Sequence, residues 1–140
     1  MNRIVEKFAQ LKQAGKKGLV VYIGAGDPNL NATHDLTLAF DRAGVAVLEL
    51  GVPFSDPLAD GLVNQLAAQR GLESGTTPPK LLGTIRKIRR HSQIPLVLYI
   101  YFNLIHKVGW KHSSPTARRR AWTVCWSWTC RRRSRIITKR

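Results

Sequence analysis

The chain has 140 residues, with 23 Lys/Arg against eight Asp/Glu and a formal net charge of +15 at pH 7. The excess is uneven, because residues 111–140 hold ten of the basic residues and no acidic one, whereas residues 1–110 have the balance of an ordinary soluble domain. No apolar run approaches the roughly 18 residues that cross a bilayer, and the amphipathic first residues do not form a signal-peptide pattern. We therefore expect a soluble cytoplasmic protein with no membrane attachment.

Metal and cofactor sites are not indicated by the composition. The two Cys lie in residues 111–140, and the four His are scattered, so neither residue type has the spacing of a zinc site. We expect no metal and no other cofactor.

The first predicted elements are a helix and a strand. Apolar residues recur at helical spacing over residues 2–13, and Gly15 follows as a stop. Residues 18–23 are a short β-branched run between glycines, which is typical of a strand buried on both faces. We then expect Thr33 to cap a second helix that ends at Gly44.

The remaining elements continue this alternation. We expect a second strand over residues 45–50, a helix over residues 62–72, a turn over residues 74–79, a helix through residues 81–88 and a third strand over residues 94–100. Strands that alternate with helices, each strand nearly all apolar, predict a parallel α/β unit. Nothing indicates internal repeats or a second folded domain.

A motif with two carboxylates follows the second strand. The string Glu49-Leu-Gly-Val-Pro-Phe-Ser-Asp-Pro-Leu-Ala-Asp60-Gly61 places Glu49 at the end of that strand and Asp60 at the end of a loop braced by Pro and Gly. Chemistry in parallel α/β folds gathers at the carboxyl ends of strands, so both carboxylates can face one cavity and one of them can move a proton. A purely structural alternative stays open, in which Glu49 is salt-bridged and Asp60 caps the next helix.

Together with Gly26-Asp27-Pro28, this string resembles the signature of the tryptophan synthase alpha subunits. The resemblance covers residues 1–110. It implies a truncated (β/α)8 TIM barrel, with about the first three β/α units present, and an enzyme of the lyase class that cleaves indole-3-glycerol phosphate into indole and glyceraldehyde 3-phosphate.

The resemblance also implies roles for single residues. Glu49 becomes the acid/base of the retro-aldol cleavage, and Asp60 becomes the acceptor for the indole N–H. Tyr22, Ile100 and Tyr101 match positions of the indole pocket, although each can equally be read as core filler.

A second set of matches concerns the partner subunit. Asp56 and Pro57 match the loop that the family uses to contact its beta subunit in an α2β2 complex. One departure from the family lies in the following helix, where Gly71 replaces the usual Ala at a cost of roughly 1 kcal/mol of helix stability.

Residues 111–140 do not continue the family pattern. Trp is always encoded by TGG and Thr by ACN, so Trp122-Thr123 and Trp128-Thr129 each contain GAC, an Asp codon, in a shifted frame. The two Asp codons are six apart, as the family spaces two aspartates in its next strand and turn. The sequence therefore predicts an out-of-frame, disordered basic tail and a catalytically inactive chain.

Two other functions remain open. The chain can act as a non-catalytic fragment that binds the beta subunit, or as a basic nucleic-acid-binding protein through residues 111–140, where Arg clusters alternate with Trp. Nucleic-acid binding explains the kinds of residue in the tail but not their order. We therefore expect no specific nucleic-acid partner.

Overall fold

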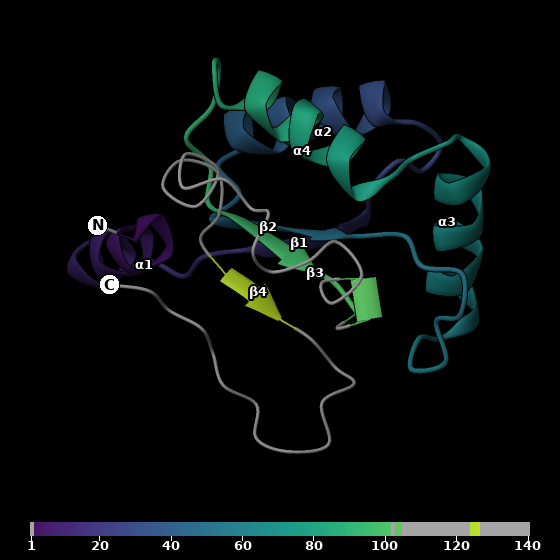
Figure 1. Cartoon of the computed structure of the whole chain (residues 1–140). Helices are drawn as coiled ribbons and strands as arrows, with labels where there is room; N and C mark the ends of the chain where they lie inside the picture. The colour runs from purple at the N-terminus through teal and green to yellow at the C-terminus, as the bar shows by residue number, and fades with distance from the viewer. Residues whose placement is uncertain (1, 102, 105–123, 127–140) are drawn as a thin grey trace.

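The computed structural model describes residues 2–101, 103–104 and 124–126 (Figure 1). Helices and strands alternate along most of the chain, as the sequence predicts. Their bounds are α1 Arg3–Gln13, β1 Val20–Gly24, α2 Leu30–Arg42, β2 Val47–Gly51, α3 Leu62–Glu73, α4 Pro78–Ile88, β3 Leu96–Tyr99 and β4 Val124–Trp126. None of the helices within these residues is both long enough and apolar enough to span a membrane.

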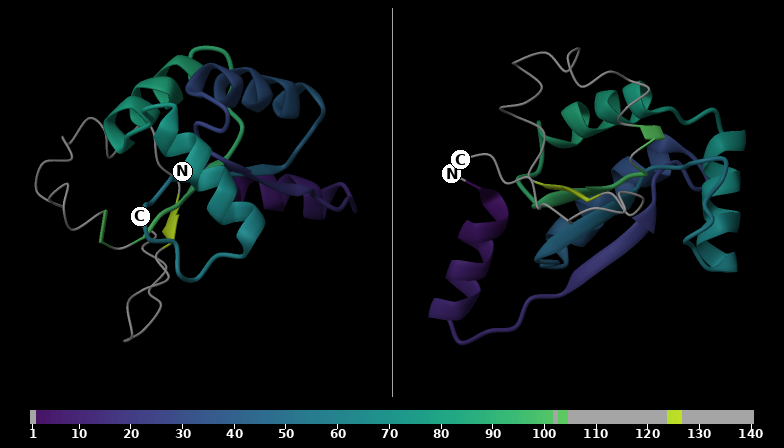
Figure 2. Two further views of the ribbon diagram at one scale, coloured as in Figure 1. Left: turned by 90° about the vertical axis from the view of Figure 1, so that its right-hand side faces the viewer. Right: turned by 60° about the horizontal axis from the view of Figure 1, so that its bottom comes forward.

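The four strands form one parallel sheet in the order β1-β2-β3-β4 (Figure 2). The prediction of a parallel α/β unit is confirmed. β4 is a difference from the expectation of a disordered tail, because Val124–Trp126 pairs with Val97–Tyr99 of β3. The side of β3 that faces away from β2 carries backbone N–H and C=O groups, and β4 pairs with this side. The rest of the predicted tail lies outside the described residues.

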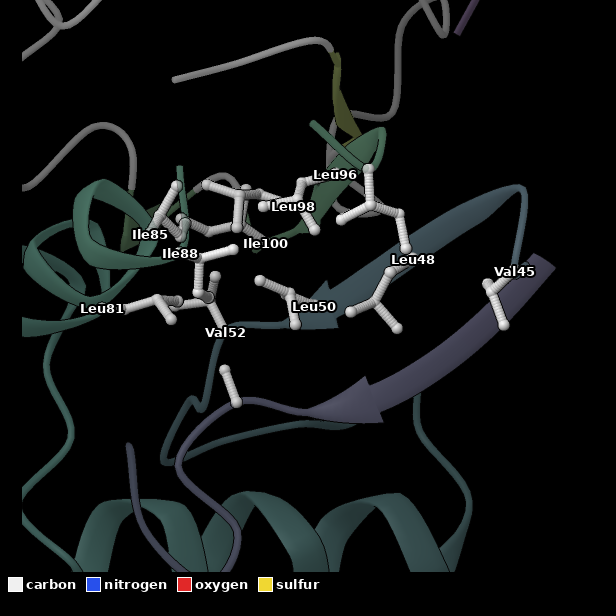
Figure 3. Close-up of a cluster of buried hydrophobic side chains, with 12 residues drawn as sticks. Val45, Leu48, Leu50, Val52, Leu81, Ile85, Ile88, Leu96, Leu98 and Ile100 are labelled. Carbon is white, nitrogen blue, oxygen red and sulfur yellow. The ribbon is translucent and has the colours of Figure 1, made fainter. Parts of the chain in front are cut away.

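Alternate residues of the first three strands build the core. On one face of the sheet, the odd-numbered side chains of β1 and the even-numbered side chains of β2 and β3 belong to one apolar cluster with α4. Figure 3 shows the β2 and β3 members Leu48, Leu50, Leu96 and Leu98 in this cluster. Its buried members from β2, β3, α4 and the adjoining loops are Val45, Leu48, Leu50, Val52, Leu81, Ile85, Ile88, Ile94, Leu96, Leu98 and Ile100. This face is closed by the two helices that lie side by side over it (Figure 1).

The opposite face is covered only in part. At the amino ends of the strands, Val47 and Val97 are buried against Ile4 and Leu11 of α1. β1 is less covered, since Val20 is 45% exposed on this face. The expectation that the first strand is buried on both faces is therefore wrong, because α3 approaches this face of β1 at Gly24 while Val20 and Tyr22 stay partly exposed. This second face is the open side of the sheet.

The cap of α2 differs from the prediction. Asn29 is the N-cap, since its side-chain oxygen accepts a hydrogen bond of 2.9 Å from the Ala32 N–H. Thr33 lies one turn inside the helix and is fully buried. Its hydroxyl accepts a 2.8 Å bond from the Gly26 N–H and donates to the Asn29 carbonyl. Thr33 therefore ties the β1–α2 loop to α2 instead of starting the helix.

The start of α4 also differs slightly. Pro78 and Pro79 lie in its first turn, where a missing N–H costs nothing, and not in the preceding turn. Gly15 and Gly44 follow their helices with φ of 62° and 83°, as the expected stops require.

Replacing each of the two helical glycines, Gly71 and Gly83, by alanine is expected to change the folding stability in opposite directions. A Cβ on Gly71 would lie 2.9 Å from the Ala25 carbonyl oxygen and 3.3 Å from Pro53, whereas a Cβ on Gly83 would meet nothing within 4 Å. We expect Gly83→Ala to stabilise the fold by up to about 1 kcal/mol and Gly71→Ala to destabilise it by about 1–3 kcal/mol. Urea unfolding followed by circular dichroism measures both, and a stabilising Gly71→Ala would contradict the close contact.

Candidate functional site

The motif loop runs from the end of β2 to the start of α3 and lies at the carboxyl ends of the strands. Its first residue is tied to β3, because the Val52 N–H donates to the Tyr99 carbonyl over 2.8 Å. Its far end turns back on itself, since the Asp60 N–H donates to the Pro57 carbonyl over 3.0 Å. The loop therefore returns Asp60 toward the strand ends that it left.

Asp60 is fixed by a tyrosine of the next strand. The Tyr101 hydroxyl donates a hydrogen bond of 2.8 Å to Asp60 Oδ2, and the Tyr101 side chain is buried. The Phe54 ring packs on Tyr101 with 4.9 Å between centroids. Asp60 does not cap α3, because the N-cap is Gly61 with no side-chain hydrogen bond. The capping alternative for Asp60 is thus excluded.

Glu49 lies in the middle of the sheet's open face. In the strand register it stands between Tyr22 of β1 and Val97 of β3, so these three side chains share one face. Glu49 is partly buried, and within the described part of the chain it forms no ion pair. The salt-bridged alternative therefore has no support among these residues.

Tyr22 and Tyr99 form an aromatic corner next to these carboxylates. Their rings meet edge to face at 6.1 Å and 87°. The Tyr22 ring extends over Gly51, where a Cβ would lie 2.1 Å from its hydroxyl oxygen. Gly51 is needed at the end of β2 because any larger residue would displace this ring.

These groups line a small, open hollow at the carboxyl ends of the strands. Four of the predicted site residues are among the lining residues, namely Tyr22, Pro57, Asp60 and Tyr101. The other lining residues are Gly24, Gly51, Val52, Pro53, Phe54, Asn64, Ala68 and Tyr99. Glu49 is not a lining residue, but it neighbours Tyr22 on the same face.

Two predicted residues lie elsewhere. Ile100 is buried in the core beneath α4, so the core reading applies and the pocket-wall prediction is wrong for this residue. Asp56 is exposed on the motif loop, away from the hollow. Tyr99 lines the hollow where Ile100 was expected, although Tyr99 is not among the predicted site residues. The alternation of side chains along a strand was the signal, because Tyr101 and Tyr99 must share a face.

The carboxylates act on the tyrosines around them. Burial and then the Asp60 charge raise the pKa of Tyr22 to about 12, and Glu49 adds to the rise. Burial, followed by the hydrogen bond with Asp60, raises the pKa of Tyr101 to about 12. The pKa of Tyr99 is raised by burial and by the same two carboxylates. Glu49 and Asp60 therefore act on one cluster of phenols.

A second set of contacts holds the neighbouring β1–α2 loop. Arg70 of α3 binds both carboxylate oxygens of Asp27 at 2.8 Å, and this hydrogen bonding lowers the pKa of Asp27. The Ser74 hydroxyl lies 3.0 Å from the Gly26 carbonyl. α3 thus joins the loops after β1 and β2 at the rim of the hollow. No group of three or more potential metal ligands occurs in the part of the chain that the structure covers.

Removal of the Asp60 charge tests this arrangement. We expect Asp60→Asn to lower the pKa of Tyr101 and Tyr22 toward the ordinary value of 10.0, because the negative charge disfavours a phenolate beside it. Absorbance at 295 nm against pH measures tyrosine ionisation. Asp56→Asn, on the exposed part of the same loop, is the matched control and should leave the titration unchanged.

The same shifts predict how folding stability changes in alkali. The folded-state pKa of both tyrosines is higher than the unfolded value, so their contribution is complete below pH 10 and disappears as the pH rises toward about 12. Asp60→Asn should flatten this decline. An identical decline in Asp60→Asn would show that the carboxylate does not act on these phenols.

Comparison with known proteins identifies the family to which this chain is similar. The sequence model of the family described as "Tryptophan synthase alpha chain" matches residues 8–119, which extends past Trp110. The alpha chains of Citrifermentans bemidjiense and Thermoanaerobacter sp. (strain X514) are 49% and 48% identical over 109 residues. These matches cover 78% of this chain but only 41–42% of the relatives, so the chain spans about two fifths of their length.

The fold is similar over the same part. The crystal structure of tryptophan synthase subunit alpha from Legionella pneumophila str. Paris superposes with a TM-score of 0.81 and 36% sequence identity. The superposition covers 87% of this chain and 47% of that chain. The sheet is therefore that of a truncated TIM barrel, and the chain belongs to the tryptophan synthase alpha chain family.

Proposed function

We propose that this chain carries the indole-binding half of a lyase site for indole-3-glycerol phosphate. The observation that carries the proposal is that two carboxylates, Glu49 on the open face and Asp60 on the motif loop, both act on Tyr22. Glu49 neighbours Tyr22, and Asp60 lines the adjoining hollow, with its carboxylate aimed by the Tyr101 hydroxyl. Aromatic walls beside one fixed carboxylate suit a planar heteroaromatic with an N–H group.

The reaction divides between the two carboxylates. Glu49 protonates the indole ring carbon that bears the side chain and also handles the proton of the side-chain hydroxyl. The bond between this ring carbon and the hydroxyl-bearing carbon of the side chain then breaks. The hydroxyl-bearing carbon becomes the aldehyde carbon of glyceraldehyde 3-phosphate, and the electron pair of the broken bond returns to the indole ring. Asp60 accepts a hydrogen bond from the indole N–H and stabilises the positive charge that develops on the indole nitrogen. Tyr101 holds Asp60 in position.

The phosphate end of the substrate has no counterpart in the described residues. TIM barrels commonly bind phosphate with the loops after strands seven and eight, and the described sheet has only β1 to β4. We therefore propose that the 140-residue chain does not turn over the substrate, because it lacks the barrel strands whose loops would bind the phosphate.

A second candidate function is binding of the beta subunit without catalysis. Asp56 is exposed, and the loop and the start of α3 expose apolar side chains beside it, with Leu58 84%, Leu62 69% and Val63 78% exposed. A cluster of this kind is typical of a protein contact surface. Co-purification with the beta subunit, lost in Leu58→Asp, would support this function.

We also propose that residues 111–140 arise from a shifted reading frame, since the order of their codons conceals the family pattern. Sequencing of the coding DNA between the codons for Gly109 and His112 tests this directly. An additional base there would show that the frame is intact in the gene. Specific binding of nucleic acid by the 140-residue chain, lost when residues 111–140 are removed, would instead favour the nucleic-acid alternative.

A chimera tests the lyase site. Residues 1–110 can be joined to the remaining part of the Citrifermentans bemidjiense alpha chain, which is 49% identical in the shared part. We expect the chimera to release indole from indole-3-glycerol phosphate and Glu49→Gln to lower kcat by about 10²–10⁴, because the acid/base is lost. The 140-residue chain itself should release none.

Glu73→Gln provides the matched control, because Glu73 is an exposed carboxylate on α3 that accepts a hydrogen bond from Gln69 and does not line the hollow. It should leave kcat unchanged. Full activity of the Glu49→Gln chimera would remove Glu49 from the mechanism.

A further inference from the structure

The sheet of this chain has two open edges among its described strands. β2 and β3 each pair on both sides, whereas β1 pairs only with β2 and β4 pairs only with β3. All four strands are parallel and follow sequence order. An arrangement of this kind is half of an eight-stranded parallel barrel.

The backbone of β1 offers hydrogen-bonding groups at its open edge. The Leu19 carbonyl accepts from Ala46 at 2.9 Å, and the Ala25 N–H donates to Gly51 at 2.8 Å. Since a parallel strand directs alternate residues to opposite neighbours, the odd-numbered residues bond to β2. The N–H and C=O groups of Val20, Tyr22 and Gly24 therefore face away from β2.

Apolar side chains are exposed beside this edge. Leu19 is 65% exposed, and Val20 and Tyr22 are 45% and 37% exposed on the open face of the sheet. α1, at the amino ends of the strands, exposes Val5 at 61% and Phe8 at 46%. Apolar surface next to an unpaired strand edge is a site for pairing with another chain.

We infer that a second copy of this chain pairs with both open edges of the sheet and closes the barrel. The superposition on 47% of the Legionella alpha chain shows that the sheet has the curvature of about half a barrel. A two-fold axis along the barrel axis places β4 of each copy beside β1 of the other, which satisfies both edges and keeps all strands parallel. The β4–β1 contact occurs twice around this axis, so the interface as a whole is isologous, is closed after two copies and does not lead to filaments.

The high net charge sets the conditions for this association. Each copy carries a formal charge of +15, so two copies repel one another at low ionic strength. The Debye length, beyond which salt largely screens this repulsion, is about 3 Å at 1 M and about 30 Å at 0.01 M ionic strength. The dimer should therefore strengthen with added salt, unlike a complex that is held by ion pairs.

Sedimentation velocity of the full chain tests the inference. At about 0.5 M salt, where screening is strong, we expect a species of twice the 15.7 kDa chain mass whose share increases with protein concentration. A monomer at every concentration would overturn the proposal. A continuous series of larger oligomers would overturn it too, because it would show edge pairing without closure.

A β1 variant distinguishes edge pairing from nonspecific apolar contact. Val20→Pro removes an N–H that faces away from β2, so the β1–β2 ladder is kept while both seams of the dimer lose a hydrogen bond. We expect its dissociation constant to rise by roughly tenfold or more. Val20→Ala keeps the N–H and should retain the dimer.

A second variant covers the case in which Val20→Pro unfolds, as judged by circular dichroism. Val20→Lys keeps the N–H but adds a charge beside the strand edge, and it should also dissociate the dimer. A Val20→Lys protein that remains dimeric would show that β1 is not at the interface.

Discussion

The alternation of side chains across the three parallel strands β1, β2 and β3 is the constraint on which the rest of the structure depends. Each strand sends every second residue into the core beneath α2 and α4 and the others to the open face. Burial of the first set fixes the strand register, because a slip of one residue would expose the whole apolar set. That register in turn places Glu49 beside Tyr22 and brings Tyr99 and Tyr101 to the same face.

Close contacts at the carboxyl ends of the strands then fix the loops. Gly51 leaves room for the Tyr22 ring, and Gly71 lets α3 approach Ala25 and Pro53. Arg70 binds Asp27 from the same helix, so α3 holds the loops after β1 and β2 together. A site that depends on two loops needs such a connection, since a carboxylate on an unsupported loop would not keep its orientation.

The sequence predicted the order of elements because strands that are apolar throughout and helices with apolar stripes have different periods. It failed where side chains compete for one role. Asn29 and Thr33 are both residue types that commonly cap helices. Asn29 is the cap, whereas the Thr33 hydroxyl lies inside the helix because it accepts a hydrogen bond from the buried Gly26 N–H. Ile100 was expected in the pocket, but Tyr99 lies there, since the face of a strand follows from register and not from residue type. The Tyr101–Asp60 bond joins residues 41 apart, and no local pattern predicts it.

We propose that the open face of the sheet, with Asp60 held by Tyr101, recognises an aromatic ring through its N–H. Titration of the 140-residue chain with indole and with 1-methylindole, followed by NMR of the tyrosine ring protons, tests this most directly. We expect indole to shift the Tyr22, Tyr99 and Tyr101 signals. We expect 1-methylindole, which lacks the N–H, to bind at least about tenfold more weakly, because Asp60 is then left without a hydrogen-bond donor. Equal affinity for the two compounds, or no shift of the three tyrosine signals, would contradict this proposal.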